Sequence, residues 1–322
     1  MRTITLEEHY ASPAFLEGPG QDLKEQAESL GYSKVLERLC DLEEGRIADM
    51  DAAGIDVQVL SLTSPGVEQL DATETVALAR EENDRLADAV RRHPSRFAGF
   101  AALPTPAPDT AADELERMVR EHGFEGAMIN GHTRGRYLDD EFFWPILERA
   151  EALEVPIYLH PTPPPQAVIE ASYTGNYAPE VAGGLATGAW GWHIETATHV
   201  IRLILSSAFD RFPSLQLVIG HMGEGLPFMM PRLELALSHV TKLNRPIGSY
   251  FLENLHYTFS GFNWTPTFLS LLLQVGVDRI MFSADYPYGS MEQARTFLDQ
   301  LPVSPAEKER IAHSNAERLL RL

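Results

Sequence analysis

The sequence predicts an α/β fold in which a single domain, residues 1–322, forms a (β/α)8 barrel. Short runs rich in apolar and β-branched residues alternate with longer amphipathic stretches, a pattern typical of βα units and a parallel sheet. Eight such runs occur, which is the number that closes this kind of barrel. The competing fold is an open doubly wound sheet, but no Gly-x-Gly-x-x-Gly sequence follows the first run.

The predicted elements follow one another in the order that such a barrel requires. The eight strands are expected at residues 3–7, 57–62, 97–103, 126–130, 156–160, 215–220, 255–260 and 279–283. Amphipathic helices are expected between them, the clearest at residues 73–92, 110–122, 139–153 and 192–209. Two long connections, residues 10–33 and 161–190, are expected to be ordered loops that bind ligand, cover the site or contact another subunit.

The composition excludes several other classes of protein. Of the 322 residues 44% are hydrophobic, which excludes a disordered chain, and the single cysteine, Cys40, excludes an internal disulfide. The first residues form no apolar run of signal-peptide length, and no segment is apolar enough to span a membrane, so we expect a cytoplasmic protein. With 26 basic and 46 acidic residues the formal charge is −20, which argues against nucleic acid as a partner. An anionic substrate would therefore need a local positive charge, from a metal ion or an arginine.

Four of the predicted strands end in residues that can bind a metal or transfer a proton. These are Glu7, Glu8 and His9 after the first strand, His160 after the fifth, His221 after the sixth and Asp285 after the eighth. The carboxyl ends of the strands form the active face of a (β/α)8 barrel. Glu7 and His9 are two residues apart in an extended segment, so both are expected to point into the barrel mouth, while Glu8 points away.

Each of these residues also has an ordinary structural explanation when it is taken alone. A Glu-x-His sequence on a strand can be incidental, His160 can be a buried histidine bonded to a backbone carbonyl, and Asp285 can cap the helix that follows it. Together, however, one Glu, two His and one Asp at the ends of three strands supply mixed nitrogen and oxygen ligands. Such a set suits one Zn²⁺ or Mn²⁺ ion with an open coordination position.

A candidate proton-transfer pair follows the sixth strand. His221 precedes Glu224 by three residues, so the carboxylate could fix the tautomer of the imidazole or raise its basicity. The structural alternative is a glycine-rich turn whose His and Glu cap the next helix. Arg232, two turns into that helix, could reach an anionic substrate or form a surface ion pair. His193 and His199 are six residues apart in a predicted helix and therefore make a poor ligand pair.

These motifs together resemble the decarboxylating branch of the amidohydrolase superfamily. The resemblance is carried by Leu-Glu-Glu-His near the start, Tyr-Leu-His-Pro on the fifth strand, Gly-His-Met-Gly-Glu-Gly-Leu-Pro-Phe after the sixth and Asp-Arg-Ile-Met-Phe-Ser-Ala-Asp-Tyr-Pro at the eighth. Further similarity at residues 46–56 and 135–143 extends it over nearly the whole chain. That branch includes the γ-resorcylate, 2,3-dihydroxybenzoate, 5-carboxyvanillate and aminocarboxymuconate-semialdehyde decarboxylases.

The resemblance implies a distorted (β/α)8 TIM barrel, one divalent metal ion per chain, and a homodimer or homotetramer. The site residues that it implies are Glu7, His9, His160 and Asp285 as metal ligands, His221 as the active-site histidine, Glu224 as its partner, and Arg232 and Tyr288 beside the substrate. Some relatives replace the second of these ligands. Hydrolytic members typically carry His-x-His on the first strand and often a lysine on the fourth, whereas this chain has Glu7 at the first position and no lysine in residues 126–130.

The function that the resemblance implies is the metal-dependent, non-oxidative decarboxylation of a small ortho-hydroxybenzoate-type acid. In this hypothesis the metal chelates the carboxylate and the neighbouring phenolate, Asp285 protonates the ring carbon, and His221 with Glu224 manages the phenol proton. The alternative is a mononuclear metal-dependent hydrolase of a lactone, ester or carbon–carbon bond, for which the same ligands would serve. A non-catalytic binding barrel is disfavoured because the whole ligand set is present.

Overall fold

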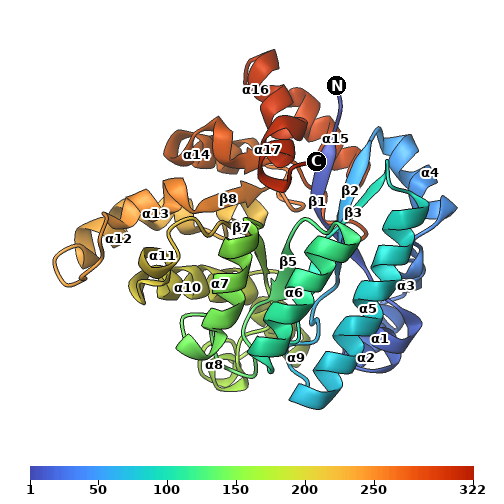
Figure 1. Cartoon of the computed structure of the whole chain (residues 1–322), viewed down its shortest axis with the longest axis horizontal. Helices are drawn as coiled ribbons and strands as arrows, with labels where there is room; N and C mark the ends of the chain where they lie inside the picture. The colour runs from blue at the N-terminus through green and yellow to red at the C-terminus, as the bar shows by residue number, and fades with distance from the viewer.

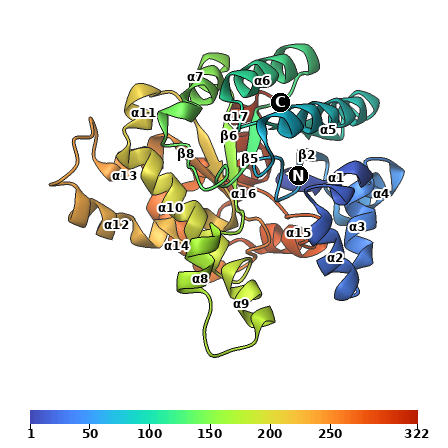
Figure 2. The ribbon, with the colours of Figure 1, turned by 90° about the horizontal axis from the view of Figure 1, so that it is seen from below.

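The computed structural model describes residues 1–322, and a parallel barrel lies at its centre (Figure 1, Figure 2). Its strands are β1 (Ile4–Tyr10), β2 (Val57–Leu62), β3 (Phe97–Gly99), β4 (Ala101–Ala102), β5 (Ala127–Asn130), β6 (Ile157–His160), β7 (Leu217–Ile219), β8 (Leu255–Thr258) and β9 (Ile280–Met281). One sheet has the order β1-β2-β3 and the other runs from β4 to β9 in sequence order. Every neighbouring pair is parallel.

Backbone hydrogen bonds join these two sheets into one closed barrel. β3 and β4 are two parts of one predicted strand, interrupted at Phe100, whose N–H still donates to the Leu60 carbonyl of β2 at 2.9 Å. At the other seam the Leu6 N–H of β1 donates to the Phe282 carbonyl, directly after β9, at 3.1 Å. The barrel therefore has the eight strands that the sequence predicts, and the predicted fold class is confirmed.

Helices surround the strands (Figure 1, Figure 2). The α-helices are α1 (Pro13–Glu17), α2 (Gln21–Ser29), α3 (Ser33–Cys40), α4 (Glu44–Ala53), α5 (Ala72–Arg92), α6 (Pro108–His122), α7 (Trp144–Leu153), α8 (Gln166–Ser172), α9 (Pro179–Ala186), α10 (Gly191–Leu205), α11 (Ala208–Arg211), α12 (Leu226–Leu237), α13 (Ile247–Glu253), α14 (Thr265–Val275), α15 (Met291–Gln300), α16 (Pro305–Glu309) and α17 (Asn315–Leu320). Short helical turns complete the fold at η1 (Glu141–Phe143), η2 (His221–Gly223), η3 (Val277–Arg279) and η4 (Arg310–Ser314). None of these helices is long and apolar enough to cross a membrane.

The best-predicted helices carry recognisable start and stop signals. At the start of α5 the Asp71 side chain accepts hydrogen bonds from the backbone N–H groups of Thr73 and Glu74, which would otherwise lack partners. α6 ends at Gly123, whose φ of 69° lies in the left-handed region that glycine adopts without strain. These signals explain why the predicted boundaries of both helices fall within two residues of the observed ones.

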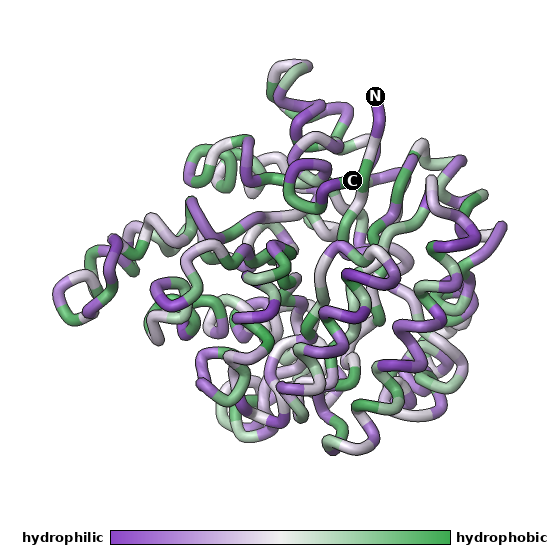
Figure 3. Tube along the Cα trace, viewed as in Figure 1, coloured by the Kyte–Doolittle hydropathy of each residue, from purple (hydrophilic) through white to green (hydrophobic).

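Two hydrophobic clusters hold the barrel together. The larger, of 66 buried residues, fills the space between the strands and the surrounding helices. The smaller, of 12 buried residues, consists of alternate strand residues such as Leu6, Val59 and Tyr158, together with Ala316 and Leu320 of α17. It fills the interior towards the amino ends of the strands, so the polar residues are left at the carboxyl end. Hydrophilic segments recur along the outer helices α5 and α6 (Figure 3).

Several predicted segments differ from the structure. The connections 10–33 and 161–190 are not loops throughout, because they contain α1 and α2 in the first and α8 and α9 in the second. Proline at the first position and serine at the N-cap start α1, a local signal that helix periodicity does not register in so short a segment. The predicted helix 192–209 is divided into α10 and α11 where Ser207 adopts a φ of 64°.

Candidate active site

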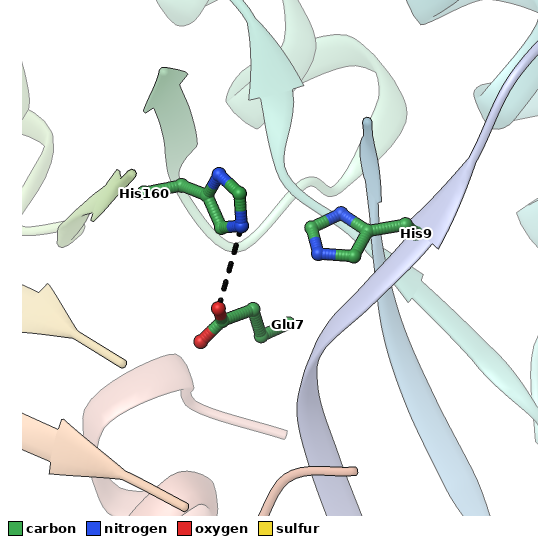
Figure 4. A group of neighbouring side chains, drawn as sticks. All are labelled: Glu7, His9 and His160. Atoms are coloured by element: carbon green, nitrogen blue, oxygen red, sulfur yellow. Dashed lines mark ion pairs between the residues drawn. The ribbon is translucent and has the colours of Figure 1, made fainter. Parts of the chain in front are cut away.

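Glu7, His9 and His160 lie together at the carboxyl end of the barrel (Figure 4). One potential ligand atom from each residue lies within 4.8 Å of those of the other two. His160 Nε2 is 3.4 Å from Glu7 Oε1, and the ring centroids of His9 and His160 are 4.8 Å apart. All three residues are buried. The structure thus brings together three of the four residues for which metal ligation is predicted.

A bulge in β1 turns Glu7 and His9 towards this cluster. The register of β1 against β2 shifts between Thr5 and Glu8, and Glu7 has a φ of 67°. Leu6 faces into the barrel, so regular alternation would also turn Glu8 inward and would leave Glu7 and His9 outside. The extra residue reverses that outcome. The predicted orientation is therefore observed, but strict alternation is not its cause.

Glu8 points away from the cluster and holds the segment that carries Asp285. Its carboxylate accepts hydrogen bonds from the Ala284 N–H at 2.8 Å and from the Tyr286 N–H at 3.2 Å. Burial raises the pKa of Glu8 to about 8, although these two hydrogen bonds act in the opposite direction. Because Ala284 and Tyr286 flank Asp285, Glu8 links the position of that aspartate to β1.

Hydroxyl groups orient the Glu7 carboxylate. They come from β6, from β8 and from the segment that follows β8. Its Oε2 accepts hydrogen bonds from the Tyr158 and Ser260 hydroxyls, and the Thr258 hydroxyl lies 3.4 Å away. Its Oε1 is buried and has no hydrogen-bond partner. The hydroxyls thus occupy one oxygen and leave the other free on the side of His160. The sequence pattern does not reveal these residues, although Thr258 and Ser260 lie at the carboxyl end of β8, which was a usable signal, whereas Tyr158 lies within β6 and gives none.

Asp285 joins the cluster from the segment that follows β9. Its Oδ1 is 3.3 Å from His9 Nε2, and its Oδ2 is 4.0 Å from His221 Nε2. The alternative that Asp285 caps the next helix is wrong, because α15 begins at Met291 and the Ser290 side chain caps it. The Asp285 side chain is 19% exposed, so its carboxylate is accessible to a ligand.

His221, Glu224 and His193 form a second buried cluster beside the first. Glu224 Oε1 is 2.7 Å from His221 Nδ1, and Glu224 Oε2 is 2.5 Å from His193 Nδ1. His221 Nε2 is 3.6 Å from Glu7 Oε1, so this imidazole connects the two clusters. Burial lowers the pKa of His221, but the charges of Glu224 and Glu7 outweigh burial and raise it to about 10. The geometry therefore contains the predicted pair of His221 and Glu224.

His193 is a member of this cluster that the sequence pattern does not reveal. His193 and His199 make a poor ligand pair, because they are six residues apart on one helix. The His193 ring nevertheless packs edge-on against that of His221, with 4.6 Å between the centroids. The Trp192 indole N–H lies 3.1 Å from its Nε2, and the Gly188 carbonyl lies 3.0 Å from the same atom. His193 thus ties the segment 161–190 to the site. The available signal was a histidine in the first turn of the helix that follows a long connection after a strand.

A pocket of about 450 Å³ lies beside both clusters. Asp285 and His221 line it, together with the aromatic rings of Trp192, Phe262 and Tyr288. The Tyr288 ring lies 5.7 Å from that of His9, measured between centroids. A pocket of this size suits a small molecule, and aromatic walls suit a flat ring.

Arg232 lies outside this pocket. Its side chain is exposed on α12 and is not among the residues that line the pocket. α12 projects away from the barrel (Figure 1), and Arg232 is seven residues beyond Gly225, about two turns along that helix. Within one chain Arg232 therefore does not reach the pocket wall, and its contact with a substrate stays a prediction.

The chemistry of the first cluster fits a divalent cation. Glu7 Oε1 and both ring nitrogens of His9 are buried without hydrogen-bond partners, which is rare for buried polar atoms. Burial raises the pKa of Glu7, so a nearby positive charge is needed to keep that carboxylate ionised. Burial also lowers the pKa of His160 well below its ordinary value, which leaves a neutral imidazole for ligation. Zn²⁺ and Mn²⁺ both accept such carboxylate and imidazole ligands.

Comparison with known proteins agrees with this site. A model of the amidohydrolase family matches residues 10–322. The γ-resorcylate decarboxylase of Polaromonas sp. strain JS666 is 37% identical to this chain, over 99% of this chain and 98% of that enzyme. A crystal structure of 2,6-dihydroxybenzoate decarboxylase complexed with 2,6-dihydroxybenzoate matches with a TM-score of 0.90 and 34% identity, over 100% of both chains.

A further solved structure carries a metal ion. The dihydroxybenzoic acid decarboxylase from Polaromonas sp. JS666, with bound manganese and the inhibitor 2-nitroresorcinol, matches with a TM-score of 0.91 and 36% identity. The match covers 100% of this chain and 97% of that one. The chain therefore belongs to the amidohydrolase family. Within that family the predicted branch, the metal-dependent decarboxylases, is confirmed, and with it the predicted enzyme class, a carboxy-lyase.

Proposed function

We propose that this chain removes the carboxyl group, without oxidation, from a small aromatic acid that carries a hydroxyl group ortho to the carboxylate. The observation that carries the proposal is the convergence of Glu7, His9, His160 and Asp285 beside a pocket with aromatic walls. The similar enzymes support the same substrate class, because γ-resorcylate, which is 2,6-dihydroxybenzoate, has hydroxyls on both sides of its carboxylate.

The proposed cofactor is one divalent metal ion per chain, Mn²⁺ or Zn²⁺, held by Glu7, His9, His160 and Asp285. When bound there, the ion supplies the positive charge that holds the carboxylate and the ortho oxygen of the substrate. That local charge offsets the repulsion between an anionic substrate and a chain of formal charge −20. The manganese in the similar enzyme from Polaromonas favours Mn²⁺.

The residues around the pocket move the protons. Asp285 donates its carboxyl proton to the ring carbon that bears the carboxylate. The bond from that carbon to the carboxylate then breaks, CO2 leaves, and the electron pair of the bond returns to the ring. His221 presents Nε2 to this region and holds the phenol proton, while Glu224 accepts the Nδ1–H of His221. His193 holds the second oxygen of Glu224 and so fixes that carboxylate.

A substrate panel tests the proposed function. The purified chain is loaded with Mn²⁺ and assayed against hydroxybenzoates with detection of CO2, and in parallel against lactones and esters. We expect CO2 from at least one ortho-hydroxybenzoate, with 2,6-dihydroxybenzoate the first to be tried. Turnover of a lactone or ester without release of CO2 would support the hydrolase alternative instead.

Removal of the metal should abolish activity. Prolonged chelation is expected to remove one equivalent of metal per chain and to lower turnover by at least about 10²-fold, because the substrate oxygens and the ligand carboxylates are then left facing one another. Addition of Mn²⁺ should restore turnover. Elemental analysis and steady-state rates measure both effects. Activity that persists without stoichiometric metal would overturn the assignment.

The substitution His221→Asn should slow turnover without removing the metal. His221 is not among the four proposed ligands, so metal content should stay at one per chain, while the rate falls by about 10²-fold or more because a proton carrier is lost. The matched control is His239→Asn, since His239 is exposed on the surface. Loss of metal from His221→Asn would make His221 a ligand. Near-normal turnover would leave it only a structural role in the turn.

The substitution Tyr158→Phe should weaken metal binding while the fold is retained. Without this hydroxyl, one hydrogen bond no longer orients Glu7, and loss of such a supporting contact typically lowers metal affinity by about 10- to 100-fold. Tyr257→Phe is the matched control, because Tyr257 is equally buried and its hydroxyl donates to the Phe251 carbonyl. Metal titration followed by elemental analysis measures the difference. Equal affinity in the two variants would show that Tyr158 does not support the site.

We also propose that the chain forms a homodimer or homotetramer through the face that includes α12 and α14. Apolar side chains are exposed on both helices, with Phe228 78% exposed, Leu235 65% and Leu273 84%. Such an exposed apolar surface indicates a protein interface. Arg232 lies on α12, so its proposed contact with a substrate depends on this assembly. Light scattering tests the proposal, and a monomer at micromolar concentration would contradict it.

A further inference from the structure

A second and larger cavity lies at the opposite end of the barrel from the candidate active site. Its volume is about 650 Å³. Pro156, Gln216, His256 and Arg279 line it, each at the amino end of one of the strands β6 to β9. Residues of the last helix, α17, and of the chain beyond it form another wall, which includes Arg318. Nothing in the proposed decarboxylation uses this cavity.

The cavity carries a local positive charge in an acidic chain. Two carboxylates line it, but each pairs with an arginine, Glu154 with Arg321 and Asp278 with Arg310 at 2.8 Å. No carboxylate pairs with the remaining two arginines of the cavity wall, residues 279 and 318. Two guanidinium groups of the wall therefore form no ion pair, although the chain as a whole carries a formal charge of −20.

Neutral neighbours hold Arg279 in place and use few of its donors. Its Nη1 lies 3.2 Å from Gln216 Oε1 and 3.0 Å from His256 Nε2. Burial lowers the pKa of His256 to about 3, so this imidazole is uncharged and offers no compensating or competing charge. No hydrogen bond of Arg279 uses Nε or Nη2. The guanidinium is thus held by Nη1, while its Nε and Nη2 donate to no other group of the protein.

Arg318, which is exposed, lies on the cavity wall that α17 forms. Its Nη2 donates to the Asp278 carbonyl at 2.8 Å and to Asn315 Oδ1 at 2.9 Å. Both acceptors are neutral, and its Nε and Nη1 form no hydrogen bond. Guanidinium groups with free N–H pairs are the groups that proteins use to bind carboxylates and phosphates through two parallel hydrogen bonds.

We propose that this cavity binds a small oxyanion with two negative charges, of the phosphate or dicarboxylate type, between Arg279 and Arg318. The two guanidinium groups match the two negative charges of such an anion. The oxygens of the anion can accept hydrogen bonds from the N–H groups that have no partner in the protein. Only three of the 12 lining residues are hydrophobic, so an aromatic ring is a poorer match. The acidic surface of the chain disfavours a large polyanion such as nucleic acid.

Calorimetric titration of the Mn²⁺-loaded enzyme tests this proposal. Sulfate serves as the tetrahedral probe, succinate as the dicarboxylate probe, and sodium chloride of equal ionic strength as the blank. We expect one sulfate or one succinate per chain, and the preferred probe identifies the ligand type. Arg318→Gln should weaken binding at least about tenfold, because charge-assisted hydrogen bonds are lost. The double variant Arg279→Gln/Arg318→Gln should abolish binding.

Two controls separate this site from the metal centre. Arg211→Gln removes an exposed arginine outside the cavity and should leave anion affinity unchanged. The cavity variants should turn over the substrate at the normal rate, because their residues lie at the other end of the barrel, and that rate also shows that they fold. If neither sulfate nor succinate binds, the proposal is overturned. Equal affinity in the double variant would also overturn it, because the anion would then be bound elsewhere.

Discussion

The substitution Asp285→Asn is expected to lower kcat by at least about 10³-fold, since it removes the proposed proton donor and general acids of this kind contribute 10² to 10⁴ in rate. The carboxylate is placed for this role by the Glu8 hydrogen bonds on both sides of it. It lies 3.3 Å from His9 and is partly exposed in the pocket, so it can serve both the metal and the substrate. Asparagine keeps the shape of the side chain but has no acidic proton.

The matched control for this experiment is Asp299→Asn. Asp299 is exposed and pairs with Arg295 at 3.2 Å on α15, so its loss should leave turnover unchanged. Metal content is measured on both variants, because Asp285 is also a proposed ligand. A rate loss with the metal retained assigns the effect to proton transfer, and a rate loss with the metal absent assigns it to ligation. Turnover close to that of the parent enzyme would contradict both roles.

Removing the ortho hydroxyl from the substrate should have a comparably large effect. If the site holds the carboxylate and the ortho oxygen together, the analogue that lacks only that hydroxyl loses one anchoring contact and the electron release that favours ring protonation. Each 1.36 kcal/mol is about tenfold in rate, and such losses amount to several kcal/mol, so we expect a gap of at least roughly 10³ in kcat/KM.

The comparison requires a matched pair of acids. The best substrate of the panel is compared with isomers in which every ortho hydroxyl is moved to a meta or para position, so that charge and size stay constant. Competition experiments show whether the isomers still bind. Similar kcat/KM values across the set would reject the ortho oxygen as the basis of recognition.

Much of the fold could be predicted from the sequence because the barrel repeats one simple unit. All eight predicted strands overlap observed ones, and the strand predicted at residues 57–62 has the same bounds as β2. The convergence of Glu7, His160 and Asp285 followed from topology alone, since parallel strands in a barrel bring their carboxyl ends to one face. Residues separated by more than 100 positions could therefore be grouped before any distance was known.

The remaining features depend on contacts that periodicity does not encode. The bulge in β1 is a single extra residue, and a strand pattern cannot show where regular alternation fails. His193 reaches Glu224 from a different helix, and Tyr158 reaches Glu7 across the barrel interior. The direction of α12, which carries Arg232 away from the pocket, is set by packing rather than by local sequence.

The proton that replaces the carboxyl group offers the most direct test of the proposed reaction. The Mn²⁺-loaded enzyme is supplied with 2,6-dihydroxybenzoate in D2O that is enriched in ¹⁸O. The products are analysed by mass spectrometry and NMR. Decarboxylation through Asp285 predicts one CO2 per product molecule and one deuterium at the ring carbon that lost the carboxylate, with no ¹⁸O in the aromatic product. An aromatic product that lacks deuterium at that carbon, or one that carries ¹⁸O from solvent, would contradict the proposed reaction.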